Sequence, residues 1–297
     1  MWINTSRKAV LVQDLSATRP IDLPEFENPP VVEVVLSLQF SELRKYKLIH
    51  AGLLWSRYRD LGFKGFSEHP PLEPRFETFG PEEEIRQPGL KIVSAAEMRP
   101  FRIWFIKKEG GELIQLQADR FVHNWRKTGD SQNYPRYERI KEKFFEEIKE
   151  LQAFFDEEGI GQIQPNQCEV TYVNLISFDD DVWTNPEAAL KVLSEVRLSP
   201  DDSNARLPTL ENAQYLARFV LADDQNEPIG RLIVSAQPAI SPDGSRMLRL
   251  ELTARGAPFR PDLDGASQFF DFGREAVVRG FTALTTAQMH KIWRRTK

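Results

Sequence analysis

Hydrophobic and polar positions follow blocks of strand-like and helix-like period along the chain. Residues 31–40 read VVEVVLSLQF, a nearly continuous β-branched run that predicts a buried central strand. A helix is expected over 41–61, where Ser41 can cap the first turn and apolar residues broadly recur at helical spacing. The Gly/Pro-rich stretch 62–89 that follows predicts loop, with one short strand at 75–79.

The clearest helix is predicted over 135–158, because its apolar residues recur at steps of three and four and Pro135 suits a first turn. Gly110-Gly111 is a hairpin signal shortly before it. The strands expected ahead of this helix cover residues 90–96, 101–108 and 112–122.

The second part of the chain repeats this order of elements. Glu33-Val34 resembles Glu169-Val170, and LIQLQADR at 113–120 resembles LRLELTAR at 248–255. The matching order of elements, their similar spacing and these local sequence similarities together favour an internal duplication. Later strands are expected at 168–178, 212–222, 231–240 and 247–255, with helices at 185–197, 266–283 and after Thr285 or Thr286.

The chain is therefore predicted to have an α+β fold of two similar halves, each strand, helix, antiparallel sheet and long helix. Residues 1–30 are expected to be an extended N-terminal arm, followed by one half at 31–160 and another at 161–297. This plan resembles a tandem duplication like that of the TATA-binding protein. The resemblance concerns the fold and carries no function with it.

Composition narrows the function classes. The 297 residues carry a net charge of −5 and a single cysteine, and the sequence pI of about 5.6 argues against a surface built as a whole to bind nucleic acid or anionic lipid. One cysteine allows no internal disulfide, and neither a signal peptide nor a membrane span is recognisable. We therefore expect a cytoplasmic protein without membrane contact.

Three passages resemble a sporadically distributed family of uncharacterised prokaryotic proteins. They are residues 28–40, residues 113–148 with the central motif Q-x-D-R-F-x-x-N-W-R, and residues 270–293. The resemblance implies a bacterial or archaeal protein and assigns no activity. A sporadic distribution suits mobile or defence-linked gene cassettes.

The central motif provides the first candidate site. It combines a carboxylate, two guanidiniums, an imidazole, an amide and an indole, which suit an anionic or planar ligand. The motif is expected at the end of a strand and in the connection to the next helix, a place where functional residues are often found. The alternative is that these groups serve packing and hydrogen bonding. The six residues are Asp119, Arg120, His123, Asn124, Trp125 and Arg126.

A secondary candidate pairs His290 with Trp293, which lie three positions apart on the final helix. A lone histidine beside an aromatic is more often a packed helix residue, and no metal site is predicted. Asp179-Asp180-Asp181 is interpreted as a solvated loop, and Cys168 as a quiet buried thiol. No catalytic residue and no cofactor are predicted.

Three functions stay open at this point. The first is a non-catalytic binding or adaptor protein that holds a protein partner or small ligand on its sheet. The second is a small-ligand sensor or enzyme that uses the Arg120–Arg126 region. The third is nucleic-acid binding through the sheet face, for which FRIWFIKK at 101–108 has suitable aromatic and basic residues but the pI does not. A homo-oligomer is compatible with all three.

Overall fold

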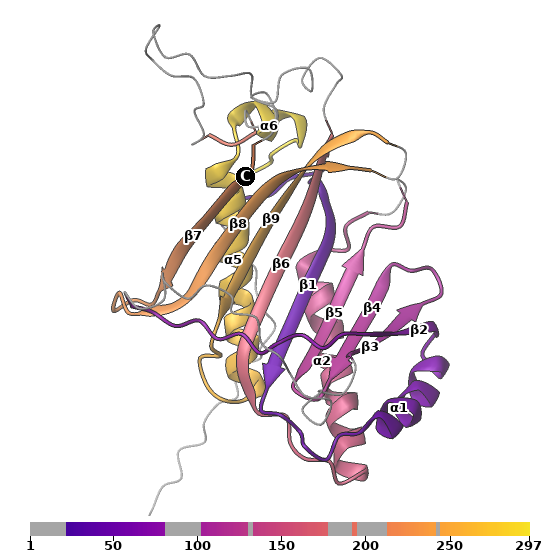
Figure 1. Cartoon of the computed structure of the whole chain (residues 1–297). Helices are drawn as coiled ribbons and strands as arrows, with labels where there is room; N and C mark the ends of the chain where they lie inside the picture. Colours follow the sequence, from indigo (N-terminus) through magenta and orange to yellow (C-terminus); the bar gives the residue numbers. More distant parts are fainter. Residues whose placement is uncertain (1–21, 81–101, 130–132, 178–191, 195–212, 242–243) are drawn as a thin grey trace, which may run out of the picture.

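The computed structural model describes residues 22–80, 102–129, 133–177, 192–194, 213–241 and 244–297. Within these ranges the chain forms one nine-stranded antiparallel sheet with its long helices on a single face (Figure 1). This arrangement confirms the predicted α+β class. We call the elements β1–α2 the first half and the elements β6–α6 the second half.

The elements of the first half are β1 (Val31–Phe40), α1 (Leu48–Asp60), β2 (Phe63–His69), β3 (Arg102–Lys107), β4 (Glu112–Gln117), β5 (Arg120–Arg126) and α2 (Tyr137–Glu157). Those of the second half are β6 (Pro165–Ser177), β7 (Tyr215–Ala222), β8 (Pro228–Ile240), β9 (Arg246–Gly256), α5 (Leu263–Leu284) and α6 (Ala287–Ile292).

The order of strands across the sheet is β2-β3-β4-β5-β1-β6-β9-β8-β7. The first strand of each half, β1 or β6, lies at the centre of the sheet, where the two pair with each other. On its other side, β1 pairs with β5 and β6 pairs with β9, the last strands of their halves. The register adds a second correspondence, because Glu33 of β1 faces Arg126 of β5 and Glu169 of β6 faces Arg255 of β9. The Glu-Val match seen in the sequence therefore falls on corresponding positions of corresponding strands.

The second sequence match, between residues 113–120 and 248–255, does not fall on corresponding elements. The single strand predicted at 112–122 is wrong. This stretch contains all of β4, which ends at Gln117, then a hairpin turn, and then the start of β5 at Arg120. LIQLQADR therefore spans two strands and a turn, whereas LRLELTAR lies within the single strand β9. Ala118 and Asp119 form this turn without glycine or proline, so the sequence carries no turn signal there.

The core lies between the sheet and the helices. On α2, the apolar positions of the predicted period face the sheet, and Phe144 packs against Phe121 of β5 and Phe270 of α5. The second long helix, α5, covers β6, β9 and β8. In α1, Trp55 stacks on Phe105 of β3, so this helix also lies on the side of the sheet that α2 and α5 cover.

Three local predictions in the first half are wrong. The helix expected from Ser41 begins only at Leu48, because the preceding turn places Leu43 and Tyr46 in the core. The stretch 63–69, expected to be loop, forms the edge strand β2. Residues 75–79 belong to no strand.

The described end of the predicted N-terminal arm is packed against the C-terminus. Phe26 forms an isolated antiparallel bridge with Arg295, and its ring contacts Phe281 and Trp293. Residues 22–30 therefore fasten the C-terminal helices to the sheet.

Several predictions lie outside the described residues: the strand at 90–96, Asp179-Asp180-Asp181, most of the helix at 185–197 and the start of the arm. The division into domains at residues 160 and 161 stays a prediction. Among the described helices, none combines the length and the apolar character needed to cross a membrane.

The single cysteine provides a test of the central strand. Cys168 of β6 is fully buried on the helix side, and burial raises the pKa of its thiol. We expect the native protein to stay unreactive toward Ellman's reagent and to release one equivalent of thiol label after denaturation in guanidinium. Rapid labelling of the native protein would contradict this placement.

Candidate functional site

The face of the sheet opposite the helices, here called the open face, carries most of the buried polar side chains of β1, β4 and β5, together with the buried apolar residues Leu113, Val122 and Val173. Side chains alternate between the two faces of a strand, so the neighbours of the core residues on β1, β4 and β5 point to this side. Several of them are buried although no helix among the described residues covers them: Ser37, Gln39, Gln115, Gln117, Arg120 and Asn124.

A segment of the chain itself covers part of this face. Residues 70–80, here called the strap, follow β2 and run as extended chain across the front of the sheet towards β8 and β9 (Figure 1). Strands β2 and β3 are hydrogen-bonded neighbours, yet residues 70–101 separate them in the sequence. The strap is thus the described part of a long connection between two neighbouring strands, and long connections often carry function.

Side-chain amides of the sheet bind the backbone of the strap. Gln117 of β4 accepts a hydrogen bond from the Leu72 amide and donates one to the Leu72 carbonyl, both at 2.9 Å. Gln39 of β1 accepts from the Arg75 amide at 2.9 Å, and Arg120 donates to the Glu73 carbonyl at 3.2 Å. These contacts recognise extended main chain and not particular side chains.

The far end of the strap is held by charge. The Glu77 carboxylate accepts from Arg255 of β9 at 3.1 Å and pairs with Arg231 of β8. Arg231 also donates to the Thr78 carbonyl at 2.7 Å, and its guanidinium lies 4.5 Å from the centre of the Phe79 ring. Only 9% of the Glu77 side chain is exposed, so these charge-assisted bonds form largely out of water.

Beside the strap, a chain of hydrogen bonds links four strands. Arg102 donates to Gln115 at 2.8 Å, Gln115 to Asn124 at 2.8 Å, and Asn124 to Glu33 at 2.7 Å. The side chain of Asn124 thus has a partner on each neighbouring strand, Gln115 of β4 and Glu33 of β1.

Trp104, an aromatic residue of the stretch considered for nucleic-acid binding, lies near the edge of this face. The Trp104 ring of β3 has Arg102 and Arg126 near it, at 5.5 and 5.6 Å. His69 stacks on the same ring at 3.9 Å. One face of the indole is therefore already covered, which leaves less of it for a nucleic-acid base.

The six motif residues do not converge on one point. They lie in the central strand β5 and the turn before it, and not in the loop that was expected. Arg120, Asn124 and Arg126 project from the open face, and Asp119 accepts a hydrogen bond from Gln117 beside the strap. His123 and Trp125 point to the helices instead.

The two residues on the helix side serve packing. His123 Nδ1 lies 2.7 Å from a carboxylate oxygen of Glu147 on α2, and both side chains are buried. Trp125 is buried with its ring centre 5.5 Å from that of Tyr134. A ligand on the open face would not reach either of them.

The secondary candidate combines a partly exposed histidine with a buried tryptophan. His290 Nε2 lies 2.9 Å from the Thr285 hydroxyl, and its ring packs edge-on against Phe26. Burial, and next the charge of Arg295, lower the pKa of His290. Trp293 is buried against Phe281, so the pair closes the C-terminal end of the core.

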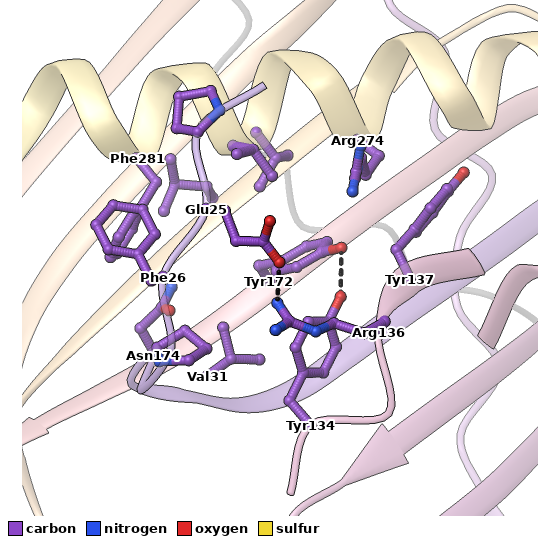
Figure 2. A pocket seen from close by; sticks show the side chains of 15 residues that line it. Glu25, Phe26, Val31, Tyr134, Arg136, Tyr137, Tyr172, Asn174, Arg274 and Phe281 are labelled. Carbon is purple, nitrogen blue, oxygen red and sulfur yellow. Dashed lines mark hydrogen bonds and ion pairs between the residues drawn. The ribbon is translucent and has the colours of Figure 1, made fainter. Parts of the chain in front are cut away.

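A small cavity of about 70 Å³ lies on the helix side. Figure 2 shows Phe26 and Phe281 at one end and Arg274 and Tyr137 at the other. Its charged groups are paired, as in the 3.2 Å contact between Arg136 and Glu25. In this measure a water molecule needs about 10–15 Å³, so the cavity has room for a few waters.

Two tyrosine hydroxyl groups near this cavity are paired with each other. The hydroxyl oxygens of Tyr134 and Tyr172 lie 2.8 Å apart, and burial raises the pKa of both. They therefore stay protonated at neutral pH and do not act as bases. Among the described residues, no group of three or more histidines, cysteines and carboxylates is placed to hold a metal ion.

No local pattern in the sequence marks the strap or its anchors. Glu77, Arg231 and Arg255 lie far apart in the chain, and only the order of the strands brings them together. No family model matches the chain, and neither a curated protein nor a solved structure shows a significant match to it.

Proposed function

We propose that this chain is a non-catalytic binding protein whose open face holds an extended segment of a partner polypeptide. The observation that carries the proposal is the double hydrogen bond between the Gln117 side chain and the backbone of Leu72. An amide that pairs with both the N–H and the C=O of one residue recognises main chain, as a neighbouring strand does.

The strap occupies this face without the burial that would fix it there. None of the residues 70–80 is buried, and Phe76 keeps 55% of its surface exposed. Its hold therefore depends on hydrogen bonds and ion pairs, of which a neutral hydrogen bond contributes about 0.5–1.5 kcal/mol net. Segments with few buried apolar contacts are the ones that open locally at the lowest cost in free energy, and in the strap the main contact that opening must break is that of the Glu77 carboxylate with its two arginines.

The surface beneath the strap is suited to exposure. It presents amide and guanidinium groups such as Gln39, Gln117 and Arg120, which water can solvate when the strap leaves. An apolar surface in this position would oppose opening by the hydrophobic effect. The sheet can therefore exchange its own segment for another extended chain.

The proposal predicts binding in trans once the strap is weakened. Leu72→Pro and Arg75→Pro together remove the two strap amides that donate to Gln117 and Gln39. We expect this double variant to bind a fluorescent peptide with the sequence of residues 69–80, measured by anisotropy. The same peptide with proline at both positions should bind at least about tenfold more weakly.

A sheet variant locates the binding. Gln117→Leu in the double-variant background should abolish binding of the peptide, whereas Gln115→Leu, on the same strand and face but without a strap contact, should leave binding largely intact. Circular dichroism and the urea midpoint establish that each variant is folded. A folded double variant that fails to bind the native peptide would overturn the proposed function.

A further inference from the structure

The open face carries a pair of arginines that the duplication does not explain. Arg231 of β8 and Arg255 of β9 are direct cross-strand partners on this face. In the first half, the residue beside Arg126 on the next strand is Gly111, whose carbonyl accepts from the Arg126 amide at 2.8 Å. Arg126 and Arg255 are corresponding arginines of the two halves. Arg255 has a second arginine, Arg231, opposite it, whereas Arg126 has Gly111.

Two like charges directly opposite each other destabilise a sheet unless an anion joins them. Glu77 of the strap is that anion, since its two oxygens contact one arginine each. Arg255 has a second carboxylate, that of Glu169 at 2.6 Å. The side chains of Arg231 and Arg255 are only 14% and 13% exposed, so a carboxylate between them is bound in a partly desolvated position.

The surroundings of this pair extend the positive charge. A hollow of about 410 Å³ lies beside the strap and is lined by Arg75 and Arg218 in addition to Arg231 and Arg255. Neither Arg75 nor Arg218 forms an ion pair with another described residue. Arg75 belongs to the strap and would leave with it, whereas Arg218 of β7 stays beside the pair. With Arg218 the hollow is more basic than Glu77 neutralises, although the whole chain is acidic.

We propose that Arg231 and Arg255 form a carboxylate-recognition site, that Glu77 is its resident occupant, and that an acidic segment of a partner polypeptide displaces Glu77 together with the strap. This inference rests on the proposed function and names its partner class. A peptide satisfies both parts of the surface, because its backbone matches Gln117 and Gln39 while an acidic side chain about five residues further along reaches the two arginines.

The test uses the full chain with Leu72→Pro, Arg75→Pro and Glu77→Gln, in which the strap is weakened and its carboxylate removed. Two peptides with the sequence of residues 69–80 are compared, one with glutamate and one with glutamine at the position of Glu77. We expect the glutamate peptide to bind about tenfold or more tightly than the glutamine peptide. Arg231→Ala should remove this preference, and Arg249→Ala, on the same face but paired with Glu251, should preserve it.

The outcomes separate the two proposals. If both peptides bind equally, the carboxylate site is overturned while the binding function stands. If neither binds to the folded protein, the binding function itself fails. If a thymidine oligonucleotide binds more tightly than the glutamate peptide and depends on Arg231, the site recognises phosphate and the polypeptide assignment is overturned.

Discussion

Replacement of Phe144 by alanine is expected to lower the free energy of unfolding by about 3–5 kcal/mol. The ring is fully buried and lies where α2, β5 and α5 meet, in contact with Phe121 and Phe270. Its removal leaves a cavity between three elements that are fixed by other contacts, so the site cannot collapse. Urea denaturation followed by circular dichroism measures the loss.

The neighbouring Phe145 provides the matched control. It lies on the same helix but is only partly buried, at the edge of the core. Phe145→Ala should therefore cost clearly less than Phe144→Ala. Equal losses would mean that α2 packs on the sheet with a different face from the one described.

The second large effect is expected at Gly256, at the end of β9. A Cβ atom there would lie 2.4 Å from the Ile229 carbonyl oxygen and 2.5 Å from the Phe269 ring. Neither neighbour is the free end of a flexible chain, so Gly256→Ala should destabilise the protein by about 2–3 kcal/mol. The midpoint of thermal unfolding should fall accordingly.

At Gly52 in α1, substitution by alanine is expected to raise stability instead of lowering it. Nothing lies within 4 Å of a Cβ added there, and the residue is in the interior of an exposed helix. Gly52→Ala should stabilise the protein by about 0.5–1 kcal/mol, because alanine restricts the unfolded chain and favours the helix. A Gly256→Ala variant as stable as the native protein would contradict the close contact at Gly256, and a destabilised Gly52→Ala variant would contradict the open space at Gly52.

The fold could be predicted where local pattern and tertiary packing agree. Helix α2 is such a place, since every apolar step of its sequence faces the sheet, and the structure ends it within a residue or two of the predicted bounds. The sequence of β1 has the same clarity, because a central strand is buried on both sides. The pairing of Glu33 with Arg126 and of Glu169 with Arg255 then shows how the two halves correspond.

Prediction failed where tertiary structure replaced a local signal. The turn at Ala118 and Asp119 contains no turn-forming glycine or proline, so β4 and β5 looked like one strand. Residues 75–79 alternate as a strand does, and they are extended, but their backbone is bound by side chains such as Gln39 and not by another strand. At the N-terminal side of α1, Ser41 provided a capping signal that the chain does not use.

The candidate site failed for a related reason. A strand sends adjacent residues to opposite faces, so the six motif residues divide between the open face and the core once β5 is recognised as a strand. Arg120 and Asn124 keep a place in the proposed binding surface, whereas His123 is committed to Glu147. The anchors of the strap could not be found in the sequence because their proximity arises only from the order of the strands.

The strap also fixes an order of events during folding. Glu77 precedes its partners Arg231 and Arg255 by 154 and 178 residues, so its docking must wait until β8 and β9 have been synthesised and paired. A growing chain that has completed its first half can bind the start of the strap through Gln117, Gln39 and Arg120, but Glu77 has no arginine pair to bind and the edge of β1 that later pairs with β6 is open. The ion pairs of Glu77 are thus the last strap contacts to form, and such late contacts affect the unfolding rate more than the folding rate.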